Sequence, residues 1–391
     1  MFLKLKYQKV FFKMTNSIII MTKKNKTVFQ YFLIILFLSS PISISSQKLN
    51  NSIYYGEDFF IIEGTEISNS LKENIYDRLP LSYKDIVRKP VWELSKNSAG
   101  ISIRFFSNST SISVKWTLLN NNKMNHMAET GIKGVDLYFN NKGNWQYVNT
   151  ARPSDVVNEY MLVKNMTIEM REYKMFLPLY DGVVSMKVGI DSNSVIEKPL
   201  KNNNKSIIFY GTSITQGGCA SRPGMAHTNI ISRKLNIDCI NFGFSGNGRM
   251  EQPINELISK FNPLFYVIEC LPNMTGEEVT NRTIPLVKTI RKMLPDTPII
   301  FVENFLYESL ALDEKEKTLV NEKNTALKTE YLKMINDQFE NIFYISSKNA
   351  TGKDHEGTVD GVHFTDLGFI RYADFLIDKF DQFGLINKKK K

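Results

Sequence analysis

The pattern of apolar residues changes near residue 200, and this change constrains the fold more than any other feature of the chain. Before it, short runs of alternating apolar and polar residues are separated by turn residues such as Asp181-Gly182. The runs are ISIRFF, SISVKWTL, GVDLYF, WQYVNT, MTIEMREYKMFLPL and VVSMKVGI. Short alternating runs are typical of half-buried β-strands. Residues 47–196 are therefore predicted to form an antiparallel β-sandwich of jelly-roll type.

After the change, continuous apolar runs alternate with stretches of helical periodicity. The apolar runs are SIIFY, DCINFGF, PLFYVIEC, TPIIFVENF and NIFYISS, and helices are expected around 224–235, 251–260, 277–294 and 313–339. This alternation predicts an α/β domain of three layers, with a parallel sheet between helices on both faces. The polar stretch 191–205 holds the boundary, so we expect a linker at 197–205 and the α/β domain at 206–391.

Residues 1–46 differ from both halves, with seven lysines and no acidic residue. The lysine-rich stretch 23–26 precedes the apolar run 29–38, and Ser43 and Ser45 are small residues suited to cleavage. This order predicts a secretory signal peptide and a secreted or periplasmic protein. The apolar run is shorter than the roughly 20 residues that span a bilayer, so no stable membrane insertion is expected. A retained N-terminal anchor is the alternative.

The charge balance gives no sign of a nucleic-acid partner. The formal net charge of +9 falls to +2 once the seven lysines of the expected signal are removed, and the tail Lys388–Lys391 is also basic. No basic stripe is left in the body of the chain. Three cysteines allow at most one disulfide, and their apolar surroundings favour buried free thiols. No Cys/His cluster has metal-binding spacing, so neither a metal nor another cofactor is expected.

Polar or glycine-rich segments follow most of the expected parallel strands. In open parallel sheets, functional groups collect at the carboxyl ends of the strands. The candidates there are Ser213 in GTSITQGG, Gly246 in NFGFSGNG, Asn273 in CLPNMT, and Asp360 with His363 in DGVHFT.

These residue types suit the hydrolysis of an acyl ester. A serine hydroxyl is a weak nucleophile until a base takes its proton, and His363 can serve Ser213 in this way while Asp360 orients the imidazole. The attack leaves negative charge on the carbonyl oxygen, which N–H donors stabilise. Suitable donors are the backbone N–H groups of Ser213 and Gly246 and the side-chain amide of Asn273. Each segment taken alone could equally be an ordinary cap or turn.

The order of these segments resembles the SGNH hydrolases, the GDSL-type esterases, whose four blocks supply Ser, Gly, Asn and an Asp-x-x-His pair. The resemblance covers about residues 205–380. It implies Ser213 as nucleophile, Asp360 and His363 as its partners, and Gly246 and Asn273 as the oxyanion hole. Two motifs depart from the family pattern: Gly-Asp-Ser is Gly-Thr-Ser here, and Gly-x-Asn-Asp is Cys-Leu-Pro-Asn. They imply a chain outside the typical lipase-like branch, so the family name does not give the substrate.

The first half resembles the β-sandwich domain that precedes this type of SGNH hydrolase. Its Gly-x-Asp-Leu-Tyr signature matches GVDLYF at 134–139, and HMAETG at 126–131 fits as well. The combination is similar to secreted bacterial carbohydrate esterases and implies removal of O-acetyl groups from an acylated oligo- or polysaccharide. The alternatives are a lipase or thioesterase that acts on longer acyl chains, and a non-catalytic glycan-binding protein.

Some further polar and aromatic residues could touch a substrate. Arg222, just after the serine segment, could bind a sugar hydroxyl or carboxylate, or form a structural ion pair. His126 could reach the site or remain a loop residue. His355 lacks the Asp-x-x-His spacing, so His363 is preferred as the base. Three tryptophans of the first half could stack on sugar rings or fill cores and interfaces: Trp92, Trp116 and Trp145.

Overall fold

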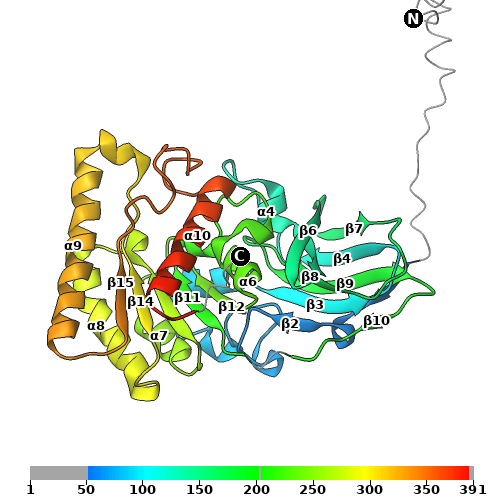
Figure 1. The fold of residues 1–391 in the computed structure, drawn as a ribbon, viewed down its shortest axis with the longest axis horizontal. Coiled ribbons are helices and arrows are strands. Elements are labelled where there is room, and N and C mark those ends of the chain that lie inside the picture. Colours follow the sequence, from blue (N-terminus) through cyan, green and yellow to red (C-terminus); the bar gives the residue numbers. More distant parts are fainter. Residues whose placement is uncertain (1–51, 202–203, 387–391) are drawn as a thin grey trace, which may run out of the picture. The chain divides into compact units, whose positions relative to one another are not determined.

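The computed structural model describes residues 52–201 and 204–386, so the expected signal peptide and the lysine tail lie outside the described residues. Figure 1 shows a part built of strands beside a part in which helices cover a parallel sheet. Among the described residues, no helix combines the length and apolar character needed to cross a membrane.

The first part is an antiparallel β-sandwich, as the alternating pattern predicts. One sheet has the order β1 (Ser52–Tyr55), β9 (Val183–Asp191), β4 (Ile112–Leu118), β7 (Val157–Val163). The other has the order β10 (Ile196–Glu197), β3 (Ser102–Ser107), β8 (Arg171–Phe176), β5 (Val135–Asn141), β6 (Asn144–Ala151), with β2 (Ile61–Glu63) beside β3.

The sandwich core follows from the period of two along each strand. In β4, Val114 and Trp116 are buried between the sheets, whereas Lys115 and Thr117 are partly exposed. The Trp116 indole N–H donates a hydrogen bond of 3.0 Å to the Lys133 carbonyl, so its one polar group is satisfied inside the core.

The second part contains the expected parallel sheet. Its order is β12 (Cys239–Gly243), β11 (Ile207–Gly211), β13 (Phe265–Glu269), β14 (Ile299–Val302), β15 (Ile342–Ile345). The longer helices are α6 (His227–Leu235), α7 (Gln252–Ile258), α8 (Gly276–Met293), α9 (Glu314–Asn336) and α10 (Asp366–Gln382). These elements confirm the predicted α/β class.

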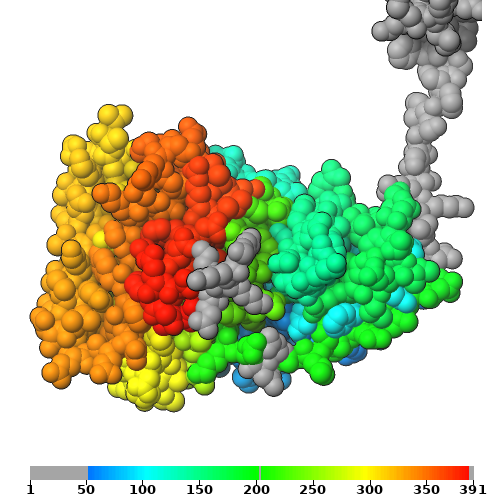
Figure 2. Space-filling model, in the orientation of Figure 1, coloured from blue at the N-terminus to red at the C-terminus, as the bar shows by residue number. Residues whose placement is uncertain are grey.

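Alternate residues of the central strand pack on opposite faces of the sheet. Phe209 lies in the core with residues of α6 and α10, and Tyr210 lies in the core with residues of α7 and α8. Both faces are therefore buried, which explains why the strand sequences are continuously apolar rather than alternating. On the face drawn in Figure 2, the side chains of the last helices and those of the sandwich strands form one continuous surface.

The segment 65–97, within the expected sandwich domain of residues 47–196, also packs against the α/β part. Leu79, Val91 and Trp92, the last two in the short helix α3 (Lys89–Ser95), pack in the core around α7 and α8. The Arg78 guanidinium is buried and donates to the carbonyls of Asn241 and Gly243 in β12. This segment joins the two parts, and its short turns carry no periodicity that could have revealed it.

Candidate active site

The serine lies in a tight turn between strand and helix. β11 ends at Gly211, Thr212 is extended, and Ser213 begins the short helix α5 (Ser213–Gln216). A Cβ on Gly211 would lie 1.9 Å from the Thr215 hydroxyl oxygen, so only glycine fits at this position. Ser213 is 8% exposed. The turn therefore presents the hydroxyl at the carboxyl edge of the sheet.

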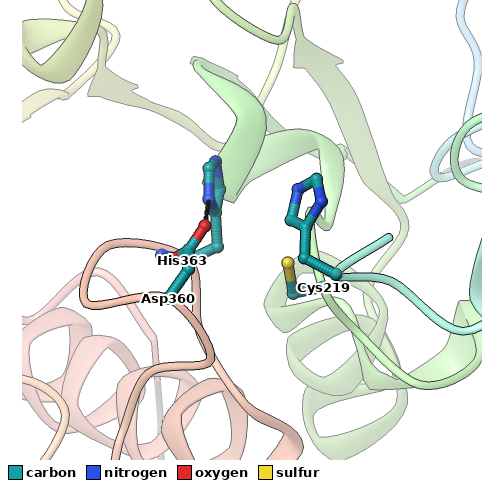
Figure 3. A group of neighbouring side chains, drawn as sticks. Cys219, Asp360 and His363 are labelled. Carbon is teal, nitrogen blue, oxygen red and sulfur yellow. Dashed lines mark hydrogen bonds and ion pairs between the residues drawn. The ribbon is translucent and has the colours of Figure 1, made fainter. Parts of the chain in front are cut away.

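A chain of hydrogen bonds joins Ser213, His363 and Asp360. The Ser213 Oγ lies 2.9 Å from His363 Nε2. His363 Nδ1 lies 2.8 Å from Asp360 Oδ2, the bond drawn as a dashed line in Figure 3. Because Nδ1 faces a carboxylate, it carries the ring proton, and Nε2 keeps its lone pair for the serine hydroxyl. The structure thus brings the three residues together in the order that the sequence predicts.

The loop around Asp360 fixes this carboxylate. Burial alone would raise its pKa, but the His363 side chain and the backbone N–H groups of His363 and Val362 lower the pKa of Asp360 to about 2. The two N–H groups donate to Asp360 Oδ1 at 2.8 and 3.1 Å. Asp360 is therefore ionised at neutral pH and held toward the imidazole.

The two predicted donor residues lie on neighbouring loops. Gly246 has a φ of +69°, and the Gly248 N–H donates to Asn273 Oδ1 at 3.2 Å. This bond orients the amide so that Nδ2 remains as a donor. Within residues 52–201 and 204–386, the N–H groups of Ser213 and Gly246 and the Asn273 Nδ2 have no protein acceptor. These groups are available to a substrate oxygen.

Residues of the sandwich part support the turn that carries Ser213. The sequence analysis missed this support. The Tyr180 hydroxyl donates to the Ser213 carbonyl at 3.2 Å. Gln216 donates to the Leu179 carbonyl at 3.0 Å and accepts from the Ser245 N–H at 3.0 Å. The loop after β8 thus braces both the serine turn and the glycine loop. Nothing in the local sequence of Tyr180 signals this contact, because its partner lies in the other half of the chain.

The buried carboxylate of Glu269 holds the same turn in place through hydrogen bonds. Glu269, the last residue of β13, is 3% exposed and accepts from Thr215 Oγ1 at 2.8 Å and from the Tyr372 hydroxyl. His227 Nε2 lies 3.2 Å from the same carboxylate. Burial and the adjacent Glu269 raise the pKa of Tyr372 well above its ordinary value. The network joins α5, β13, α6 and α10 beneath Ser213.

Arg222 is engaged in an ion pair between the two parts of the molecule. Its guanidinium donates to Asp136 Oδ2 at 2.7 Å and to the Tyr138 hydroxyl at 2.6 Å. Burial alone would lower the pKa of Arg222, but Tyr138 and Asp136 raise this pKa above its ordinary value. Asp136 and Tyr138 belong to the GVDLYF signature, so the structure favours the ion-pair interpretation of Arg222.

The structure distinguishes between the remaining polar candidates, His126, His355 and Cys219. The His126 ring centroid lies 5.8 Å from that of His363, so His126 reaches the site. His355 is exposed and pairs with Glu308 at 2.7 Å. Cys219 lies beside the Asp360–His363 pair in Figure 3. Burial and the charge of Asp360 raise the pKa of Cys219 to about 12, so the protonated thiol is no rival nucleophile at neutral pH.

The tryptophans lie where protein atoms cover them. Trp92 and Trp116 are buried in the two parts of the molecule. Trp145 is partly exposed, but its indole N–H donates to Asn236 Oδ1 at 3.2 Å and the Lys174 ammonium lies 5.1 Å from the ring centroid. All three therefore take part in core or interface packing.

Comparison with known families identifies one match in each part of the chain. The GDSL-like lipase/acylhydrolase family matches residues 204–380. The GxDLY family, described as the N-terminus of SGNH-hydrolase-type esterases, matches residues 54–196. Both resemblances inferred from the sequence are thereby confirmed. A search of curated proteins finds no match.

Solved structures share the arrangement of both parts. A structure from Bacteroides ovatus, named as a GDSL-like lipase, is 33% identical with a TM-score of 0.83, covering 87% of this chain and 100% of that chain. A salicylyl-acyltransferase from a tetracycline biosynthetic pathway is 15% identical with a TM-score of 0.72, covering 86% and 98%. A family two carbohydrate esterase from Clostridium thermocellum, in complex with cellohexaose, is 12% identical with a TM-score of 0.54, covering 74% and 94%. The last two likenesses establish a shared fold.

Proposed function

Because the chain belongs to the GDSL-like lipase/acylhydrolase family and is an ester-hydrolysing enzyme with a GxDLY N-terminal domain, we propose that it removes small acyl groups, O-acetyl above all, from a carbohydrate. The observation that carries the proposal is the hydrogen-bonded chain Ser213–His363–Asp360. It supplies an activated hydroxyl, a base with a free lone pair and an ionised partner for the base.

In the first step, the Ser213 hydroxyl attacks the ester carbonyl while His363 Nε2 takes its proton. Asp360 stabilises the imidazolium that forms, and its low pKa keeps it from taking the proton itself. As the bond between the acyl carbon and the sugar oxygen breaks, the imidazolium gives its proton to that oxygen, which leaves as a sugar hydroxyl. Water repeats the sequence on the acyl-serine, releasing the carboxylic acid and restoring Ser213.

The oxyanion of each tetrahedral intermediate is stabilised by N–H donors. We assign this role to the Gly246 N–H and the Asn273 side-chain amide, with the Ser213 N–H as a further donor. Donors stabilise the oxyanion most strongly when they already point at it and need not rearrange as the charge develops. The bond from the Gly248 N–H to Asn273 Oδ1 and the contacts of Gln216 supply that preorganisation.

A saccharide substrate is supported by the fold neighbours. The Clostridium thermocellum esterase of related fold binds cellohexaose. In this chain, the sandwich part supplies the exposed His126 beside His363, so a bulky polar alcohol would meet both parts of the molecule. A longer acyl chain would instead need an apolar trench beside Ser213. We further propose that residues 1–46 direct the protein to the periplasm or outside the cell, where polysaccharides are found.

A series of nitrophenyl esters from acetate to octanoate tests the reaction and its acyl preference. We expect the highest kcat/KM with acetate, and a loss of about 10³-fold or more in Ser213→Ala, because no other group replaces the nucleophile. Ser259→Ala is the matched control, because within residues 52–201 and 204–386 its hydroxyl bonds only to the Glu256 carbonyl. Activity that rises toward octanoate would identify a lipase or thioesterase, and an active Ser213→Ala would contradict the serine mechanism.

A further inference from the structure

Metal-binding side chains from distant parts of the chain meet beside the proposed base. His126 comes from the loop after β4, Cys219 from the turn after α5, and Asp360 and His363 from the loop before α10. One ligand atom of each lies within 4.8 Å of the ligand atoms of the others. The sequence shows no metal-binding spacing because these residues converge only in the fold.

The donor set has the composition that Zn²⁺ prefers. Imidazole nitrogen, thiolate sulfur and carboxylate oxygen are the usual protein ligands of zinc, and the ion is held tetrahedrally. Ligand atoms around tetrahedral zinc are separated by about 3.3–3.8 Å, given bonds of about 2.0–2.3 Å. The observed upper limit of 4.8 Å therefore requires a contraction of about 1.0–1.5 Å at most. His126 is exposed on a loop, so its side chain can supply that movement.

In His126 and Cys219, one atom that can coordinate a metal ion makes no hydrogen bond within the described part of the chain. His126 Nδ1 lies 3.0 Å from the Asn125 side-chain oxygen, so Nδ1 carries the proton and Nε2 keeps a free lone pair. Within the described part of the chain, the Cys219 sulfur has no hydrogen-bond partner, whereas the sulfurs of Cys239 and Cys270 each donate to a carbonyl. Cys219 also adopts a φ of +72°, which is unusual for a residue with a Cβ and directs this thiol to its place.

We propose that His126 and Cys219, together with His363 or Asp360, form an inhibitory site for Zn²⁺ or a similar ion. On binding, the Cys219 S–H bond breaks, its proton leaves to solvent, and a sulfur–metal bond forms. If His363 Nε2 joins the ion, Ser213 loses its base. If Nδ1 or the Asp360 carboxylate joins instead, the bond that orients the imidazole is lost. Each arrangement stops ester hydrolysis while the metal is bound.

Binding can be tested without any activity, by titrating Co²⁺ into the purified, metal-free full chain. A thiolate bound to Co²⁺ gives a charge-transfer band in the near ultraviolet, which we expect in the wild type and in Ser213→Ala. We expect Cys219→Ala to lose the band and His126→Ala to bind Co²⁺ about 10- to 100-fold more weakly. Cys239→Ala and His355→Ala remove the same residue types outside the cluster and should bind like the wild type.

The inhibition itself rests on the proposed function and is measured separately. We expect Zn²⁺ to inhibit the hydrolysis of nitrophenyl acetate, a chelator to restore it, and the inhibition constant to rise about 10- to 100-fold in Cys219→Ala and His126→Ala, each compared with its own metal-free rate. No charge-transfer band in the wild type would overturn the site, whatever the activity. Equal inhibition of the wild type and both variants would also overturn it, because the ion would then bind elsewhere.

Discussion

At the residue scale, the three-residue spacing of Asp360 and His363 allows one loop to supply both partners of the serine. The carboxylate reaches back to the imidazole of His363 and also accepts two backbone N–H groups. This local part of the site could be predicted from sequence, because spacing along one loop limits the geometry. Tyr180 and Cys219 could not, because only the fold brings them to the site. For His126, the sequence left the site and a plain loop position equally open, and the structure places it beside His363.

The ionisation of Asp360 gives a prediction at this scale. Because its pKa is lowered to about 2, Asp360 should stay charged at every pH above about 4, and its contribution to stability is lost only as the pH falls from about 4 through 2. The ¹³C shift of its carboxyl carbon, followed by NMR, should therefore be flat from about pH 4 to 8. Asp354, whose pKa is also about 2, provides an exposed comparison. A midpoint for Asp360 above pH 5 would contradict the hydrogen-bonded carboxylate.

At the element scale, two glycines of the loop after β12 differ in their surroundings. Gly248 lies close to the backbone of the serine turn, whereas Gly246 has open space around it. A Cβ on Gly248 would lie 1.8 Å from the Gly211 carbonyl oxygen. A Cβ on Gly246 would meet no atom within 4 Å, although its φ of +69° disfavours other residues. Both glycines can be seen in the sequence. Only the structure shows that Gly248 is required by a close contact, whereas Gly246 is favoured by its backbone conformation.

Alanine at these two positions should therefore give different results. Gly248→Ala must displace the Gly211 backbone next to Ser213, so we expect it to lower both kcat and the free energy of unfolding, the latter by roughly 1–3 kcal/mol. Gly246→Ala is expected to cost about 1 kcal/mol of stability from its left-handed backbone, with a smaller loss of kcat. Ester kinetics and urea unfolding measure both effects. A Gly248→Ala enzyme with the kcat of the wild type would contradict the fitted contact.

At the scale of the whole molecule, the two parts share the site and are joined across it. The sequence predicted the class of each part, because strand and helix periodicity are local and extend over long segments. It did not predict the joining segment 65–97, whose residues pack with α7 and α8. Nor could it choose between the substrate and ion-pair interpretations of Arg222, because the partner Asp136 lies in the other half of the chain.

Replacing Arg222 distinguishes these two roles. Arg222→Ala leaves the Asp136 carboxylate, which is fully buried, without its cation, so we expect the free energy of unfolding to fall by about 3–5 kcal/mol. KM for nitrophenyl acetate should change little at a temperature where the variant is folded. Arg152→Ala is the control, because among the residues that the structure describes its guanidinium bonds only to the Tyr160 hydroxyl. Unchanged stability with a raised KM would instead assign Arg222 to substrate binding.

The most direct test of the proposed function is acetate release from acetylated xylan by the purified protein, with Ser213→Ala measured in parallel. If Ser213 is the nucleophile of a carbohydrate esterase, the wild type releases acetate and the variant releases none above background. Equal release by both proteins, or no cleavage of either xylan or aryl acetates by the wild type, would contradict this function.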